Sequence, residues 1–349
     1  MSVDATPWDW RPSPAGWCQA LEPRIEFWAQ RPGIERRAAG EALLQAADAG
    51  ADWLFHPLCH ALYAAEPSAK SDLQLLIWTG LHAPEALEDI LAEAPLQVWA
   101  AGGEVEVAAG RHRIADLAAE VAGQPSPLPI ALDLWFESAE PADDLELGFA
   151  RERLWRHSPP RPGCETEAVE EDVVRFFRTQ SVLARALPEV ARWVEGATHV
   201  VVPLRPSEDG AFNSSSQPEL PGLIFADIRA PAEIAEALAH ETAHQYFRLF
   251  EASGPIVDPG HADSYASPLR REPRPLRGVF LAYHALAYIC ALFAETERLG
   301  ESWIHPREMA DLREKTAEAE ATLVAARAHL TAAGQGFFER TREVARHGA

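Results

Sequence analysis

Two histidines separated by three residues lie in the segment His240-Glu241-Thr242-Ala243-His244. On an α-helix, positions i and i+4 lie one above the other on one face, so both imidazoles could bind the same metal ion. Glu241 would then lie beside the open coordination positions. The flanking residues are mostly apolar, which is typical of a helix packed into a core. The sequence therefore predicts a metal site on a helix; the alternative is two surface histidines near a carboxylate.

A catalytic metal site usually has three protein ligands and leaves a position for water or substrate. The third ligand has several candidates downstream of the motif. Glu251 lies seven residues beyond His244, about 10 Å along a helix, which is too far to share the ion. His261 and Asp263 lie in a loop that could fold back toward the motif. His284 lies in an almost wholly apolar predicted helix and is the favoured third ligand.

Four arginines gather in the proline-rich segment 267–278, namely Arg270, Arg271, Arg274 and Arg277. Prolines restrict the backbone around them, and guanidinium groups bind carboxylates through two parallel hydrogen bonds. Two interpretations are open. The arginines pair with the abundant surface acids, or one or two of them bind an anionic substrate or cosubstrate beside the metal.

Residues 198–295 resemble the HExxH-motif proteins that are encoded beside ribosomally made, modified peptides. The resemblance rests on the predicted strand at 200–204, the serines at 214–216, the HExxH helix, the Arg-x-Glu-Pro-Arg-Pro element at 270–275, and the helix carrying His284. The arginine–proline element is much more specific than HExxH alone. The N-terminal half carries no motif that matches this family.

The resemblance implies an iron(II)- and 2-oxoglutarate-dependent hydroxylase that acts on a side-chain β-carbon of a precursor peptide. It implies that the iron ligands are His240, His244 and His284. It also implies that 2-oxoglutarate is bound by Arg274, with Arg270 or Arg277. Family members carry a histidine nearer position 281, where this chain has Leu281, so His284 would take the ligand role one turn later.

Two other functions stay open at the level of sequence. In a zinc metallopeptidase, Glu241 would be the general base that takes a proton from the attacking water. That chemistry explains Glu241 directly but leaves the arginines without a role. In the hydroxylase, Glu241 would bind the metal, orient a histidine or position substrate. The third possibility is a metal-stabilised binding protein without catalysis.

The composition limits the kinds of partner. The chain has 349 residues, of which 47% are hydrophobic, and its net charge is −22. An acidic surface disfavours nucleic acid and anionic membranes as partners, whereas a peptide is compatible with it. Four dispersed cysteines, with no visible secretory signal and no uncharged apolar run of membrane-spanning length, predict a cytoplasmic protein with reduced thiols.

Hydrophobic patterns predict an α+β fold that is mainly helical, with a zincin-like active-site helix next to a small sheet. We expect residues 1–164 to form a mixed, mainly helical region that could recognise substrate or a leader peptide, and residues 165–349 to form the catalytic domain. The main predicted elements are a hairpin around 97–107, strands at 128–136, 198–204 and 222–227, a polar loop at 206–221, and helices at 72–94, 165–193, from 231 through the motif, 279–299 and 306–329.

Overall fold

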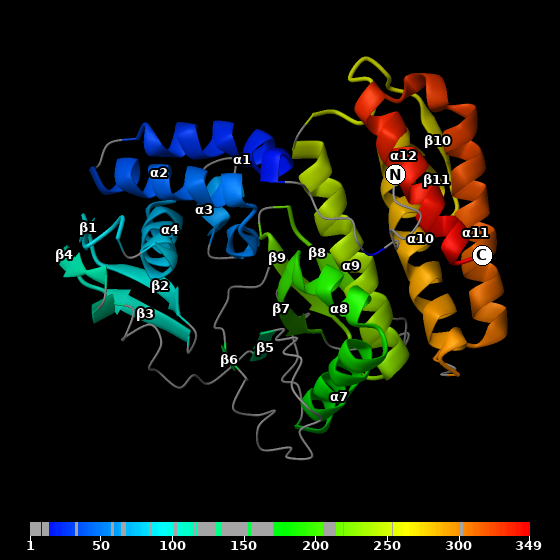
Figure 1. Ribbon diagram of the computed structural model, residues 1–349, viewed down its shortest axis with the longest axis horizontal. Helices are drawn as coiled ribbons and strands as arrows, with labels where there is room; N and C mark the ends of the chain where they lie inside the picture. Colours follow the sequence, from blue (N-terminus) through cyan, green and yellow to red (C-terminus); the bar gives the residue numbers. More distant parts are fainter. Residues whose placement is uncertain are drawn as a thin grey trace.

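The structure is a computed structural model (Figure 1). It describes Trp8 and residues 14–31, 34–56, 59–63, 68–83, 85–100, 103–114, 116–117, 130–133, 153–154, 170–204, 214–218, 220–252, 254–300 and 303–349. The fold is mainly helical with small sheets, which agrees with the predicted α+β class. The predicted domain boundary at residue 164 lies outside these residues.

The N-terminal part consists of short helices followed by two small antiparallel strand pairs. Its helices are α1 (Pro14–Ala29), α2 (Ile34–Ala49), the 3₁₀ turn η2 (Asp52–Phe55), α3 (His60–Tyr63) and α4 (Ala69–His82). Its strands are β1 (Asp89–Ala92), β2 (Leu96–Ala100), β3 (Gly103–Val107) and β4 (Gly110–Arg113). β1 pairs with β4 and β2 with β3, so the predicted hairpin is confirmed. The predicted helix at 72–94 is wrong in its second half: α4 ends at His82, before the proline at position 84, and Asp89–Ala92 forms strand β1.

A five-stranded sheet lies at the centre of the molecule. Its strands follow the order β6 (Arg153–Leu154), β5 (Ile130–Asp133), β7 (Thr198–Pro203), β9 (Gly222–Ala226) and β8 (Ser214–Ser216). β7 and β9 are parallel, and β8 lies at the edge, antiparallel to β9. The helices α7 (Glu170–Ala186) and α8 (Pro188–Glu195) precede β7. Strands from both sides of residue 164 therefore contribute to one sheet.

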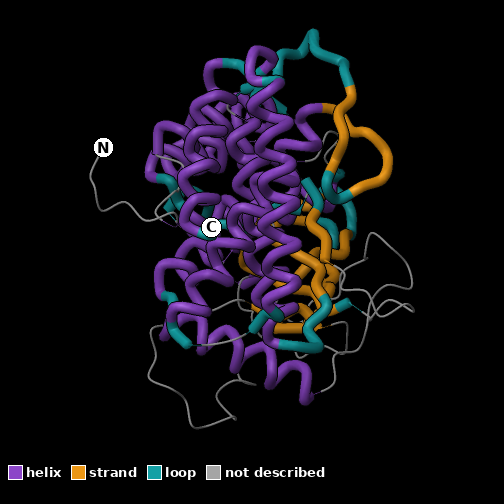
Figure 2. Tube along the Cα trace, turned by 90° about the vertical axis from the view of Figure 1, so that its right-hand side faces the viewer, coloured by secondary structure: helices purple, strands orange, loops and turns teal. Residues whose placement is uncertain are grey.

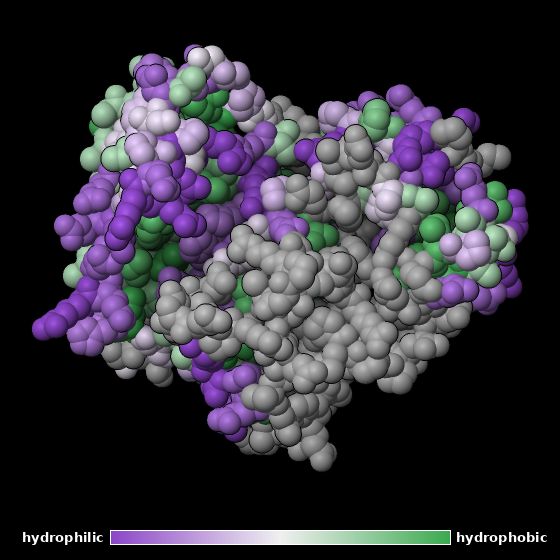
Figure 3. Space-filling model, turned by 180° about the vertical axis from the view of Figure 1, so that it is seen from behind, coloured by the Kyte–Doolittle hydropathy of each residue, from purple (hydrophilic) through white to green (hydrophobic). Residues whose placement is uncertain are grey.

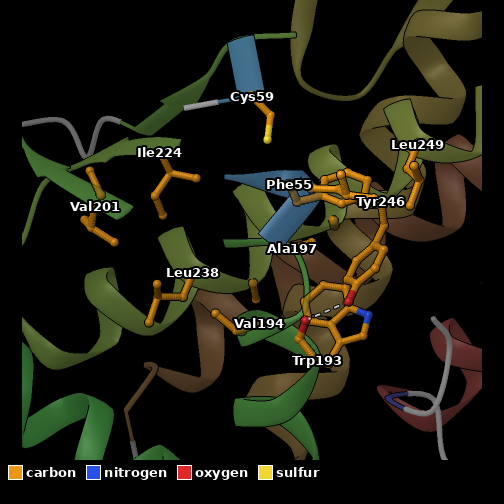
Figure 4. Close-up of a cluster of buried hydrophobic side chains, with 14 of the residues drawn as sticks. Phe55, Cys59, Trp193, Val194, Ala197, Val201, Ile224, Leu238, Tyr246 and Leu249 are labelled. Carbon is orange, nitrogen blue, oxygen red and sulfur yellow. Dashed lines mark hydrogen bonds between the residues drawn. The ribbon is translucent and has the colours of Figure 1, made fainter. Parts of the chain in front are cut away.

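The predicted motif helix is present as α9 (Pro231–Ala252). Pro231 suits its first turn because the ring fixes the backbone in a helical conformation. Figure 4 shows Leu238, Tyr246 and Leu249 of α9 in one cluster with Val201 and Ile224 of the sheet. The Tyr246 hydroxyl donates to the carbonyl of Trp193, at 3.0 Å, and this bond links α9 to α8. The sheet side of α9 is therefore fixed by packing.

The C-terminal part is a group of long helices with a hairpin beside them. These elements are β10 (Ser264–Ser267), β11 (Arg270–Pro275), α10 (Leu276–Arg298), α11 (Pro306–Ala325), the 3₁₀ turn η4 (Arg327–His329) and α12 (Ala332–His347). α10 packs against α9, α11 and α12. It is long and apolar enough to cross a membrane, yet 83% of its most apolar stretch is buried inside the protein. Figure 2 shows the strands on one side of the helices.

Two segments near the motif differ from the sequence-based expectation. The polar loop at 206–221 contains strand β8, and the arginine-rich segment forms strand β11 of a hairpin with β10. Neither segment alternates apolar and polar residues, which is why the pattern did not predict strands. In addition, α12 follows the last predicted helix, which ends four residues early, at Ala325.

Two glycines of α12 give a matched test of this packing. A Cβ on Gly334 would lie 1.9 Å from the carbonyl oxygen of Ile256, whereas a Cβ on Gly336 would meet no atom within 4 Å. We expect Gly334→Ala to lower the free energy of unfolding by more than about 2 kcal/mol, because a backbone carbonyl must shift. Gly336→Ala should raise it by about 0.5–1 kcal/mol through helix propensity. Urea denaturation measures both, and equal effects would contradict this placement of α12.

Candidate metal centre

The two motif histidines converge on one point at the surface of α9. His240 Nε2 and His244 Nε2 are 2.9 Å apart, and the two rings are nearly perpendicular. The nitrogens are therefore close enough together for a single ion lying about 2.1 Å from each. Both residues are only half-buried, whereas the neighbouring positions of α9 are mostly buried. The structure therefore brings together the first two predicted ligands.

Glu241 points toward the edge strand of the sheet. Its side chain is only 2% exposed, and both carboxylate oxygens accept hydrogen bonds from β8. Ser214 Oγ donates to Oε1 at 2.6 Å, and Ser216 Oγ donates to Oε2 at 2.7 Å. Oε1 is also 4.0 Å from Nε2 of His240. The carboxylate therefore lies beside the histidine pair and is held from the strand side.

Arg248 extends this network by one step. Its Nη1 donates to Ser216 Oγ at 3.3 Å, and its Nη2 donates to the Ser216 carbonyl at 3.0 Å. Arg248 lies one helical turn beyond His244, so His240, His244 and Arg248 form a single stripe along α9. The stripe presents two imidazoles and one guanidinium beside β8.

His284 is fully buried in α10, and its hydrogen bonds define its tautomer. The Thr341 hydroxyl donates its only hydrogen to the carbonyl of Phe337, at 3.0 Å. The 3.1 Å bond between His284 Nδ1 and Thr341 Oγ1 must therefore use a hydrogen on Nδ1. Nε2 then carries a lone pair, and it is buried without a hydrogen-bond partner. Burial lowers the pKa of His284 to about 3, which keeps the ring neutral, as a metal ligand requires.

The structure does not join His284 to the histidine pair. Among the described residues, no three His, Cys, Asp or Glu side chains lie close enough together to bind one ion. Two of the other candidates have different partners: Glu251 binds Arg277, and His261 Nε2 is 2.8 Å from the Tyr265 hydroxyl. Asp263 is exposed on the loop before β10. The third ligand therefore stays a prediction.

The arginines of segment 267–278 lie in different environments, on β11 and at the start of α10. Arg277 donates two hydrogen bonds to the carboxylate of Glu251, at 2.6 and 2.5 Å. Arg270 is exposed, whereas Arg274 is half-buried, and neither forms an ion pair with any described residue. Gly278 leaves room for Arg274, because a Cβ there would lie 3.3 Å from the Arg274 Nε. Arg274 is therefore the least exposed of the four arginines.

The surroundings of His244 favour its neutral form. Burial lowers the pKa of His244 well below its usual value, and electrostatic interactions with His240, Arg248, His284 and Arg274 lower it further. A neutral ring keeps its lone pair available to a metal ion. His244 Nδ1 is buried and has no hydrogen-bond partner among the described residues, so the acceptor that usually orients a ligating histidine is not seen there.

The sequence pointed to the serines at 214–216 only as part of the resemblance, without a role, and it did not indicate Arg248 or Thr341. Helical spacing could have identified Arg248, which lies four residues beyond His244 on the same face. The serines lie 27 and 25 residues before Glu241, and Thr341 lies 57 residues beyond His284. No local pattern connects residues at these separations.

No protein-family model and no curated protein shows a significant match to this chain.

A carboxyl group one turn before the pair provides a test by pH. Burial, together with the charges of Glu233 and Glu308, raises the pKa of Glu236 to about 7. A raised carboxyl pKa stabilises the fold below the unfolded pKa, and that contribution is lost as pH rises through about 7. We expect Glu236→Gln to have a higher thermal midpoint than wild type at pH 8, with the difference disappearing near pH 5. The control Glu297→Gln, at an exposed position, should show no such pH-dependent rise in the thermal midpoint. An equal rise for Glu236→Gln at pH 5 and pH 8 would contradict the raised pKa of Glu236.

Proposed function

We propose that this protein is an iron(II)- and 2-oxoglutarate-dependent hydroxylase that modifies a side-chain β-carbon in a ribosomally made precursor peptide. The observation that carries this proposal is the converging pair of half-buried histidines, with Arg248 on the same stripe of α9 and Arg274 half-buried without an ion-pair partner among the described residues. Both guanidinium groups lower the pKa of His244. The Glu241 carboxylate balances part of this positive charge, and a divalent cation at the pair would favour a further anion.

A dicarboxylic cosubstrate satisfies this requirement. One carboxylate of 2-oxoglutarate would lie at the metal, and the other would accept bidentate hydrogen bonds from a guanidinium. Arg274 is suited to this role because it is half-buried and has no ion-pair partner among the described residues. Arg277 already binds Glu251, and Arg270 is exposed, so each is a weaker candidate than Arg274 for this contact with the carboxylate.

In this proposal, the histidines hold the ion, and Glu241 lies beside the position of the peptide. His240 and His244 would hold iron, with the lone pair of His284 Nε2 as the candidate third ligand. Bound iron with 2-oxoglutarate supplies the oxidising chemistry: one oxygen atom of O₂ enters the peptide C–H bond, and the other enters succinate as CO₂ is released. Glu241 and its serine partners lie beside the pair and would border the position of the peptide. A peptide partner and a cytoplasmic location belong to the same proposal.

A zinc metallopeptidase is the second candidate, and the position of Glu241 favours it. The Oε1 atom lies 4.0 Å from His240 Nε2, close to where a metal-bound water would be activated. An active-site helix packed beside a sheet with an antiparallel edge strand also suits a zincin-like arrangement. However, both carboxylate oxygens already accept serine hydrogen bonds, and this reaction gives Arg274 no role.

Purified protein supplied with iron(II), ascorbate and 2-oxoglutarate should form succinate, and a susceptible peptide should gain one oxygen atom. Mass spectrometry and succinate quantification measure these products. We expect His240→Ala and His244→Ala to abolish both succinate formation and iron binding, because each removes a ligand nitrogen. Peptide cleavage with bound zinc, without succinate and with complete loss of activity in Glu241→Gln, would establish the metallopeptidase in place of the hydroxylase.

The arginine assignment has its own matched pair of variants. We expect Arg274→Met to weaken 2-oxoglutarate binding by roughly 10-fold or more, because a charge-assisted bidentate contact is lost. Arg271→Met, at an exposed position of the same strand, should leave the affinity for 2-oxoglutarate within about twofold of wild type. Titration of the iron-loaded protein with 2-oxoglutarate measures both. Equal affinities in the two variants would mean that Arg274 does not bind the cosubstrate.

A further inference from the structure

A hydrogen-bond network of four side chains connects α9 to the edge strand β8. Arg248 donates to Ser216, Ser216 donates to Glu241, and Ser214 donates to the other oxygen of the same carboxylate. Arg248 and Glu241 lie on α9, and both serines lie on β8. The network therefore spans the boundary between strand and helix next to the histidine pair.

The donor and acceptor types fix the direction of each hydrogen bond. A guanidinium can only donate, so Ser216 Oγ must accept from Arg248. The hydroxyl hydrogen of Ser216 is then free to donate to Glu241 Oε2, at 2.7 Å. Arg248 also binds the Ser216 backbone carbonyl, which holds the serine in place from a second side. The orientation of the Ser216 hydroxyl is thus determined by Arg248.

Strand alternation separates these serines from the residue between them. Successive side chains of a strand point to opposite faces, so Ser215 faces away from α9. The pairing with β9 agrees with this assignment. Ser214 and Ser216 lie opposite Ala226 and Ile224, which belong to the core cluster that includes α9. Ser215 lies opposite Phe225, which belongs to the separate cluster on the other face.

The carboxylate held in this way occupies a defined place relative to the metal ligands. Oε1, which Ser214 holds, is the oxygen that lies 4.0 Å from His240 Nε2. Because Glu241 is 2% exposed, the serine hydroxyls replace most of the hydration that its carboxylate would have in water. Loss of one donor would leave an unsatisfied buried oxygen and would allow the carboxylate to rotate away from its position.

We infer, building on the proposed function, that Ser214, Ser216 and Arg248 are positioning residues for Glu241. They set the direction of its carboxylate beside the open side of the metal site. Ser214 donates to the oxygen nearest His240. Ser216, whose hydroxyl is oriented by Arg248, donates to the other oxygen. Glu241 is accordingly a fixed group that orients what binds at the metal, and β8 is the element that fixes it.

The test compares Ser214→Ala and Ser216→Ala with the matched control Ser215→Ala in the full chain. At saturating 2-oxoglutarate, we expect the rate of succinate formation to fall roughly 10-fold or more in the first two variants. Their KM for 2-oxoglutarate should stay within about twofold of wild type, because Arg274 is untouched. Ser215→Ala should match wild type in both quantities. Ser214→Thr and Ser216→Thr keep the hydroxyl and should recover most of the rate.

A second measurement separates this inference from the proposed reaction. Cobalt(II) bound to the protein gives visible absorption bands that report the surroundings of the ion. We expect these bands to change in Ser214→Ala and Ser216→Ala, but not in Ser215→Ala, with all variants folded by circular dichroism. If wild type forms no succinate, the proposed function fails while the cobalt spectra still test the positioning role. Identical spectra and rates in all three alanine variants would overturn the inference, as would threonine variants that behave like alanine.

Discussion

Burial of the Glu241 carboxylate constrains the whole region around the histidine pair. A carboxylate that is 2% exposed needs hydrogen-bond donors, and the described structure supplies them from Ser214 and Ser216. This requirement brings β8 against α9, although the serines themselves contribute little apolar surface. Since β8 also pairs with β9, the carboxylate ties the edge of the central sheet to α9.

The same helix must serve packing and chemistry on different faces. The apolar residues of α9 bury one side against the sheet, where Figure 4 shows Leu238 in one cluster with Val201 and Ile224. The helix also packs against α10. The half-buried stripe of His240, His244 and Arg248 is left between these surfaces. A helix held on two sides keeps this stripe in one place, so the nitrogens converge before any ion binds.

Electrostatics give the site a character unlike that of the rest of the protein. The chain carries a net charge of −22, and Figure 3 shows hydrophilic residues over much of the described surface at either side of the molecule. Beside the histidine pair, Arg248 and Arg274 contribute positive charge, and both lower the pKa of His244. The buried Glu241 carboxylate lies next to them, so both signs of charge meet at this place in an acidic protein.

The sequence by itself determined the elements whose patterns are local. The apolar residues around His240 and His244 recur at helical spacing, so the helix and the convergence of its histidines could be predicted. The β-branched run at 198–203 predicted β7 for a similar reason. Only the tertiary structure decided that Ser214 and Ser216 form a strand, that Arg277 binds Glu251, and that Thr341 holds His284 Nδ1 and leaves Nε2 without a partner. Each of these depends on residues 25 to 57 positions apart. Contacts at such separations arise from how the chain packs, and no pattern within one segment specifies them.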